Sequence, residues 1–306
     1  MNRNSETIRI SDECLVIPEV RDFNPDQIFD CGQCFRWEKN SAGLWQGIAG
    51  GRRAAVEYDA TGADCSAYAD CSAYVDCGTG VLRIEDSLLR SGGCTREEAL
   101  KYWRNYFDLD RDYGAIKKKL TEDDPVMEEA ISYGRGIRIL RQEPWETLIS
   151  FIISQNNNIP RIKKCIEALA ETLGEKGNLP SPEVLAKADL GDLACCRLGY
   201  RDKYLIEAAG QYLMWGMPGT AQELQRFSGV GPKVANCIAL FGLGLVDSFP
   251  IDVWMRRVMN RLYGFEESDT KGMAAFAGEK FAPYGGIAQQ YLFYFITHKG
   301  VDNGGE

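Results

Sequence analysis

The stretch Leu224–Met259, LQRFSGVGPKVANCIALFGLGLVDSFPIDVWMRRVM, decides the fold that we expect for this sequence. Its apolar residues follow helical spacing and are interrupted by a short turn in which Gly229 and Gly231 flank Val230. Glycine accepts positive φ and Pro232 suits a first helical turn, so the pattern predicts helix, tight turn, helix. Main-chain N–H groups at such a helix start can hold an anion such as a DNA phosphate. A plain helix corner, in which the glycines only relieve crowding, is the alternative.

Two ionisable residues follow this turn at helix starts. Lys233 falls in the first turn of the second helix, where the positive end of the helix dipole and desolvation by bound DNA favour a neutral amine. A neutral amine can attack carbon and form a Schiff base. Asp252, in FPIDVW, precedes the next helix as an N-cap, and a carboxylate there could also stabilise a sugar cation or move a proton. A solvated lysine and a plain cap are the alternatives, because spacing alone does not bring the two residues together.

The remaining sequence divides into a strand-rich first part and a helical second part. Short β-branched and aromatic runs predict strands at 34–39, 44–50, 52–59 and 80–86. Thr95 and Glu98 form a capping-box pattern that predicts a helix over 95–109. From about residue 113, apolar residues recur at helical spacing in segments at 124–134, 144–158, 159–174, 180–188, 200–216, 220–227, 231–244, 251–264 and 286–300. We therefore predict an N-terminal α/β domain over 1–112 and an all-helical domain over 113–306, packed together.

Composition and charge indicate a globular protein with a locally basic second half. The 306 residues carry a net charge of −9, which argues against a general nucleic-acid coat protein. Residues 197–261 hold eight basic and five acidic side chains, whereas residues 1–108 hold twelve basic and eighteen acidic ones, so DNA is expected to meet the later half. No apolar run reaches the roughly 20 residues of a membrane span, and the first residues lack the apolar core of a secretory signal. We expect a cytoplasmic protein with no membrane contact.

The 11 cysteines are odd in number and scattered, which favours free thiols over a disulfide framework. Cys65, Cys71 and Cys77 recur every six residues in DCSAYADCSAYVDC. Zinc usually takes cysteine pairs two to four residues apart, often with histidine, and the lone His298 is far away. We interpret the repeat, near 64–77, as a surface insertion and expect no metal site.

Four further segments, together with the hairpin, carry a resemblance to a known family. FSGVGPKVANCIALFG and FPIDVW resemble the helix-hairpin-helix motif with a Gly/Pro…Asp loop (HhH-GPD) of base-excision DNA glycosylases. The segments that resemble 8-oxoguanine DNA glycosylase/AP lyases are DCGQCFRW, ISQNNNIPRI, LGYRDKY and PYGGIAQQYLF, and they occur in order between residues 14 and 298. The resemblance implies an α+β fold, with an N-terminal twisted antiparallel β-sheet domain with helices and then an all-helical HhH-GPD glycosylase core. It also implies a monomer that acts on damaged double-stranded DNA in the nucleoid.

The resemblance further implies roles for individual residues. Lys233 would attack C1′ of a flipped 8-oxoguanine nucleotide, Asp252 would stabilise the oxocarbenium charge, and β-elimination would nick the strand. The Gly32 carbonyl would accept the N7–H that guanine lacks, with Phe293 and Cys237 stacked on either side of the base. Gln289 would bond its Watson–Crick edge. Helix packing is the alternative for Phe293 and Cys237, and only the match to PYGGIAQ selects Gln289 over its neighbour.

A second set of implied roles concerns the rest of the DNA. The residues that would hold the opposite cytosine are Asn156, Arg161 and Arg201, with Tyr200 as a wedge in the stack. Those that would bind phosphate are Gly229, Val230 and Gly231. No organic cofactor or catalytic metal is implied, although a monovalent cation could sit on the hairpin carbonyls. Trp254 departs from the family pattern, since a histidine that contacts phosphate is expected there.

Two rival functions are weighed against this one. Other glycosylases of the superfamily include enzymes with a four-cysteine iron–sulfur cluster after the catalytic helices, and no cysteine follows Cys237 here. Alkyl-base glycosylases of the superfamily keep the aspartate but lack a lysine at the position of Lys233. A non-catalytic helix-hairpin-helix module would bind DNA without needing Lys233, Asp252 and a base pocket together.

Overall fold

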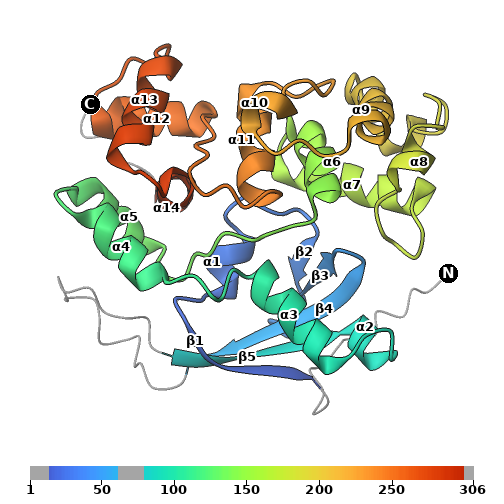
Figure 1. Ribbon diagram of the computed structural model, residues 1–306, viewed down its shortest axis with the longest axis horizontal. Helices are drawn as coiled ribbons and strands as arrows, with labels where there is room; N and C mark the ends of the chain where they lie inside the picture. Colours follow the sequence, from blue (N-terminus) through green and yellow to red (C-terminus); the bar gives the residue numbers. More distant parts are fainter. Residues whose placement is uncertain (1–13, 61–78, 300–306) are drawn as a thin grey trace.

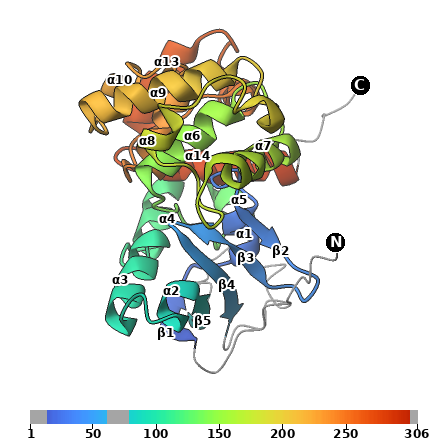
Figure 2. The same cartoon turned by 90° about the vertical axis from the view of Figure 1, so that its right-hand side faces the viewer.

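A computed structural model describes residues 14–60 and 79–299 of the chain, so the Cys65, Cys71 and Cys77 repeat lies outside the described residues. Figures 1 and 2 show a helical layer lying over one side of a smaller, sheet-containing part. In the two described ranges, no helix is both long and apolar enough to cross a membrane.

The sheet has five antiparallel strands in the order β1-β5-β4-β3-β2. The strands are β1 Leu15–Arg21, β2 Trp37–Lys39, β3 Trp45–Ala49, β4 Arg52–Asp59 and β5 Thr79–Asp86. The last four of these were expected from the sequence, and β1 was not. Its run LVIPEVR contains Pro18, which lacks the N–H that a strand ladder needs and is confined to edges and bulges. Here β1 is an edge strand, and its register shifts between Ile17 and Val20.

One face of the sheet is covered by α3 (Arg96–Tyr106). The predicted capping box is present, because Thr95 Oγ1 accepts from Glu98 N at 3.2 Å and Glu98 Oε2 accepts from Thr95 N at 2.8 Å. Helical spacing turns Ala99, Trp103 and Tyr106 to one side, and these residues are buried in the same core as strand residues of β4 and β5. The N-terminal core is therefore a sheet packed on a helix.

The helical layer contains most of the other helices. They are α4 Tyr113–Thr121, α5 Pro125–Tyr133, α6 Pro144–Ser154, α7 Ile159–Leu173, α8 Pro182–Leu185, α9 Arg201–Trp215, α10 Ala221–Leu224, α11 Pro232–Phe241, α12 Val253–Tyr263, α13 Thr270–Lys280 and α14 Gly285–His298. The short helices α1 Pro25–Phe29 and α2 Ser87–Arg90 flank the sheet, and Ala194–Cys196 is one 3-10 turn. The helix α13 was not singled out from sequence, since its glycines and alanines, TKGMAAFAGEK, give little apolar contrast.

The segment that follows α1 leaves the sheet and enters the helical core. Cys31 and Phe35 belong to the hydrophobic cluster of the helical layer, whereas Phe29 and Trp37 on either side belong to that of the sheet. Gln33 is fully buried between them. Its Nε2 donates to the carbonyls of Ile28 and Arg138, each at 2.9 Å, and its Oε1 accepts from Leu140 N at 2.8 Å. This loop therefore joins the two cores.

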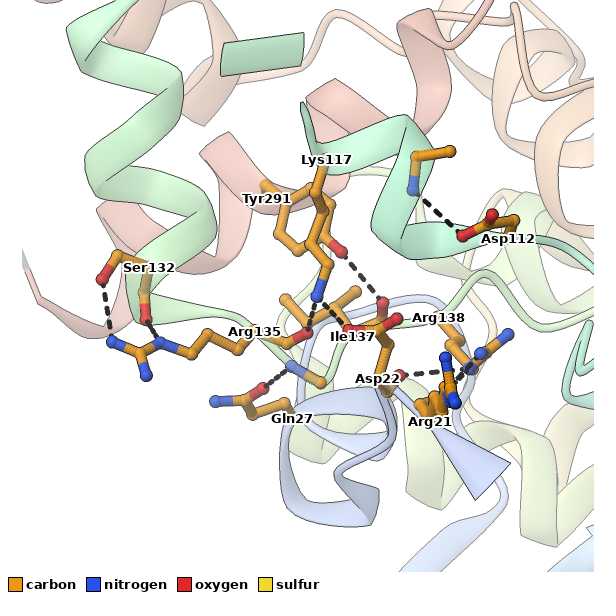
Figure 3. A network of polar contacts seen from close by, with 12 residues as sticks. Arg21, Asp22, Gln27, Asp112, Lys117, Ser132, Arg135, Ile137, Arg138 and Tyr291 are labelled. Carbon is orange, nitrogen blue, oxygen red and sulfur yellow. Dashed lines mark hydrogen bonds and ion pairs between the residues drawn. The ribbon is translucent and has the colours of Figure 1, made fainter. Parts of the chain in front are cut away.

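A buried ion pair also joins the sheet-containing part to the helical layer (Figure 3). Lys117 of α4 donates to the carboxylate of Asp22, which follows β1, and to the carbonyl of Arg135 at 3.0 Å. Arg138 donates to the carbonyl of Arg21 at 2.7 Å and to the carbonyl of Asp108 at 2.7 Å. Both members of the Lys117–Asp22 pair are more than nine-tenths buried, so neither charge is solvated if the other is removed.

Replacing Lys117 by methionine should lower the free energy of unfolding by about 3–5 kcal/mol, because it leaves the Asp22 carboxylate buried without its partner. The double change Asp22→Asn and Lys117→Met removes that charge, and asparagine accepts the φ of 49° found at position 22. The double variant should therefore be closer to the wild type than Lys117→Met alone. Urea unfolding followed by circular dichroism tests this order, and a double variant that is the less stable of the two would contradict it.

Candidate functional site: a lysine–carboxylate cleft

A cleft of about 720 Å³ lies where several elements of the helical layer meet the loop after α1. Its walls come from that loop, the α6–α7 loop, the starts of α11 and α12, and α14. Eight of the predicted site residues line it, namely Gly32, Asn156, Gly231, Lys233, Cys237, Asp252, Gln289 and Phe293, and so does Trp254, which departs from the family pattern. Residues from four distant parts of the chain thus converge on one hollow.

Lys233 and Asp252 stand at neighbouring helix starts on the cleft wall. Gly231 is the N-cap of α11 and Pro232 its first residue, so Lys233 lies in the first turn, as predicted. Asp252 is the N-cap of α12, and its Oδ1 accepts from Met255 N at 2.8 Å. Burial raises the pKa of the Cys237 thiol, the Lys233 ammonium opposes that rise, and the Asp252 carboxylate adds to it. The charges of Lys233 and Asp252 thus both act on the Cys237 thiol.

An apolar floor lies beneath the lysine. Lys233 Nζ is 5.4 Å from the centroid of the Phe151 ring, close enough for a cation–π attraction. Phe151 in turn packs on Phe35 and Phe241, with each pair of ring centroids 5.5 Å apart. This floor was not predicted, since the apolar spacing of α6 and α11 gives the same signal for plain core residues.

Gly32 lies close to the ring of Phe293, with little room for a side chain between them. Its φ is 74°, and a Cβ built there would lie 3.2 Å from Phe293 Cε1. A side chain at this position would therefore be strained in its backbone and would press on the ring. The glycine thus allows the loop after α1 to lie close to the aromatic side chain of α14.

The adjacent glutamines of α14 have different surroundings. Gln290 Nε2 donates to the carbonyl of Cys31 and so anchors the loop that carries Gly32. Gln289 is 5% exposed and also lines the cleft, yet within the described residues its Oε1 has no hydrogen-bond partner. A buried amide oxygen without a partner costs about 1–3 kcal/mol, so this atom is ready for a donor from a ligand.

The α6–α7 loop and the start of α9 form a hydrogen-bonded unit beside the cleft. Asn156 has a φ of 45°, and its Nδ2 donates to Tyr200 Oη at 3.2 Å. Arg201 is 4% exposed and lies 4.5 Å from the centroid of the Tyr200 ring. Tyr200 itself is exposed. Arg161 is exposed too, and its Nη2 donates to the Arg197 carbonyl at 3.4 Å.

Five predicted residues do not line the cleft: Arg161, Tyr200, Arg201, Gly229 and Val230. The two hairpin residues lie just before Gly231, in a turn that Val230 N closes onto Phe227 O at 3.0 Å. The other three lie on the α7 and α9 side. The cleft lining therefore includes all six residues implied for the reacting nucleotide, together with Asn156 and Gly231 from the two other groups.

Two polar residues were missed by sequence reasoning. Gln33 fixes the Gly32 loop, and Gln155 of the α6–α7 loop donates to the hairpin carbonyl of Gly229 at 2.8 Å. Both lie inside quoted motifs, DCGQCFRW and ISQNNNIPRI, but no periodicity marks them. In residues 14–60 and 79–299, no group of three or more His, Cys, Asp or Glu is arranged to hold a metal ion.

The thiols described by the structure should differ widely in reactivity. A hydrogen bond with Thr172, 3.2 Å away, lowers the pKa of the exposed Cys195 thiol, whereas burial raises the pKa of Cys31 to about 12 and also raises that of Cys237. Alkylating reagents attack the thiolate, whose fraction at pH 8 is larger when the pKa is lower. Iodoacetamide at pH 8 should therefore label Cys195 well before Cys31 and Cys237. Peptide mass spectrometry measures the order, and earlier labelling of Cys237 would contradict it.

Comparison with known proteins places this geometry in a family. Residues 15–148 match the model of the 8-oxoguanine DNA glycosylase N-terminal domain, and residues 149–283 match that of HhH-GPD superfamily base excision DNA repair proteins. A probable N-glycosylase/DNA lyase of Methanothermobacter thermautotrophicus is 28% identical over 72% of this chain and 81% of its own length.

Two solved structures are similar along nearly the whole chain. MBOgg1 in complex with a low-affinity DNA ligand has a TM-score of 0.80 and 37% identity, covering 98% of this chain and 100% of its own. Clostridium acetobutylicum 8-oxoguanine glycosylase/lyase, in complex with double-stranded DNA containing cytosine opposite 8-oxoG, has a TM-score of 0.79 and 34% identity, covering 97% and 99%. The two matched domains and this end-to-end similarity show that the chain belongs to the 8-oxoguanine DNA glycosylase family of bifunctional N-glycosylase/DNA lyases in the HhH-GPD superfamily.

Proposed function

We propose that this chain excises 8-oxoguanine from duplex DNA and then nicks the strand at the resulting site. The observation that carries the proposal is the cleft in which Lys233, Asp252 and the unpartnered Oε1 of Gln289 come together. Its volume of about 720 Å³ is within the usual range of small-molecule sites and is sufficient for one flipped nucleotide.

The proposed chemistry begins at the amine of Lys233. Bound DNA desolvates Lys233 and so favours loss of its ammonium proton. The neutral Nζ then attacks C1′ of the flipped nucleotide, and the bond from C1′ to the base breaks with its electron pair leaving on the base. The Asp252 carboxylate stabilises the positive charge that develops on the sugar. The amine, now bonded to C1′, loses a proton as the sugar ring opens to a Schiff base. Removal of a C2′ proton then expels the 3′ phosphate by β-elimination.

Recognition of the base is assigned to the cleft walls. The Gly32 carbonyl accepts the N7–H of 8-oxoguanine, whereas guanine would present a bare acceptor there. Phe293 and Cys237 stack on the two faces of the base. Oε1 of Gln289 accepts from an N–H of its Watson–Crick edge, which supplies the missing partner of a buried atom.

The remaining DNA contacts are assigned to the residues around the cleft. Asn156, Arg161 and Arg201 hold the cytosine opposite the lesion, and the exposed ring of Tyr200 fills the gap in the stack. Gly229 and Gly231 offer main-chain N–H groups to a phosphate, and Val230, whose N–H is bonded to the Phe227 carbonyl, holds the turn between them. The monomeric state, the nucleoid location and a monovalent cation at the hairpin stay predictions.

The rival functions make different use of the same cleft. A binding module would hold lesion DNA and leave it intact. Another glycosylase of the superfamily would excise a different base and would not need the unpartnered oxygen of Gln289 to face an N–H of 8-oxoguanine. The position of Lys233 beside Asp252 and Cys237 favours catalysis over binding alone.

Borohydride should trap a covalent adduct between the wild type and a duplex with one 8-oxoguanine opposite cytosine, since reduction fixes a Schiff base. Lys233→Gln should give no adduct and no strand scission. Lys271→Gln is the matched control, because that lysine also lies in a first helical turn, of α13, and does not line the cleft. An adduct that persists in Lys233→Gln would make another residue the nucleophile, and lesion binding without base release by the wild type would favour a binding module.

The neighbouring glutamines should give opposite results when each is replaced by leucine. Gln289→Leu removes a buried atom without a partner, so stability should be kept while single-turnover excision slows about 10- to 100-fold through one lost bond to the base. Gln290→Leu leaves the Cys31 carbonyl without its donor, so the melting temperature should fall. Thermal melting and excision kinetics are measured on both variants. A large drop in melting temperature for Gln289→Leu would contradict its assignment to the base.

A further inference from the structure

We propose that Gln155 is a positioning residue that couples recognition of the opposite base to the hairpin carrying the nucleophile. This inference rests on the proposed function and deepens it. Gln155 lies at the end of α6, between the loop assigned to the opposite strand and the cleft, which it also lines. Its main chain and its side chain are bound to different parts of the site.

The main chain of Gln155 belongs to the opposite-strand loop. Arg201 Nε donates to the Gln155 carbonyl at 2.9 Å, its Nη1 to the Leu198 carbonyl at 3.0 Å, and its Nη2 to the Gln155 and Asn156 carbonyls, the latter at 3.2 Å. Arg201 has five N–H groups, so these four bonds leave one, on Nη1, for DNA. The buried guanidinium therefore holds Gln155, Asn156 and the Leu198 carbonyl in one unit.

The side chain of Gln155 leaves that unit and binds the hairpin. Nε2 donates to the Gly229 carbonyl at 2.8 Å and to the Ile152 carbonyl at 3.1 Å, so both of its N–H groups are used. Gly229 has a φ of 78°, and a Cβ there would lie 2.7 Å from Tyr204 Cδ2. The hairpin turn is thus held from α9 by close packing and from the α6–α7 loop by Gln155.

These contacts connect the loop that meets the opposite base to the hairpin that carries Lys233. Gly229 is two residues before the N-cap of α11 and four before Lys233. A displacement of the α6–α7 loop, caused by the base that it meets, moves the Gln155 carbonyl and pulls on the Gly229 carbonyl through one side chain. Cytosine would seat the loop in the geometry seen here, and another base would shift the hairpin and misplace the amine. A small misplacement of a reacting group is costly for the rate.

The test is single-turnover excision of 8-oxoguanine opposite each of the four bases. Gln155→Met keeps the length of the side chain without its donors, and Gln155→Glu places an acceptor against the Gly229 carbonyl. In both variants the rate opposite cytosine should fall about tenfold, as expected for one lost hydrogen bond, while the rates opposite the other bases change by less than about twofold. The ratio of the excision rate opposite cytosine to the rates opposite the other three bases should therefore fall.

Gln225→Met is the matched control, because it makes the same substitution at an exposed glutamine that caps α10 and does not line the cleft. Gln225 Nε2 donates to the Ala221 carbonyl at 3.5 Å within its own helix, so the preference of this variant for cytosine should equal that of the wild type. An equal fall opposite all four bases, or an unchanged preference in Gln155→Met, would show a merely structural residue and overturn the inference. A wild type that excises 8-oxoguanine without preferring cytosine would overturn the inference alone, and one that excises no 8-oxoguanine would overturn the proposed function as well.

A double-mutant cycle adds a second readout. If Arg161 senses the cytosine and Gln155 transmits the result, the double variant Arg161→Ala with Gln155→Met should lose no more rate opposite cytosine than the more damaging single change. Independent, additive losses would mean that the two residues do not act in series.

Discussion

The hydrogen bonds of Gln33 are the constraint on which the site depends. This fully buried amide donates to one carbonyl on each side of the domain junction and accepts from Leu140 N, so the loop after α1 has one position against the helical layer. That position brings Gly32 against Phe293 and the Cys31 carbonyl within reach of Gln290. Because a buried amide with unmet bonds is costly, sliding the loop by one residue would lose several interactions together.

The residues that line the cleft come from both parts of the molecule. The helical layer supplies Lys233, Asp252 and the hairpin turn, which lie in the region that matches the HhH-GPD model, residues 149–283. The loop after α1 supplies Cys31, Gly32 and Phe35, none of them charged, and it lies in the region that matches the 8-oxoguanine-type N-terminal domain. In the proposed function, Gly32 of this loop acts together with Gln289 and Phe293 of α14 in recognising the base.

The sequence predicts the fold better than it predicts the supporting contacts. Capping chemistry at Thr95, helical spacing and the Gly–Pro turn before Lys233 are local, and the structure confirms them. The strand β1 was not predicted, because its apolar run contains Pro18 and a proline there argues against a strand. The choice of Gln289 over Gln290 needed the resemblance, and the structure supplies a physical reason in the different partners of the two side chains. The bonds of Gln33 and Gln155 join residues far apart in sequence, which no local pattern encodes.

The proposed function gives the Asp252 side chain a second purpose beside its helix cap. Its Oδ1 holds the first turn of α12, so the carboxylate is already oriented before DNA arrives, and the proposed reaction would need little reorganisation there. Asparagine caps a helix about as well as aspartate does, but it carries no charge. In the proposed mechanism, a natural variant with asparagine here would fold and occupy lesions but would lack the charge that stabilises the sugar cation. The abundance of such a variant in a cell would therefore be a poor measure of its repair capacity, and the variant could interfere with a functional copy by shielding the damage that it binds.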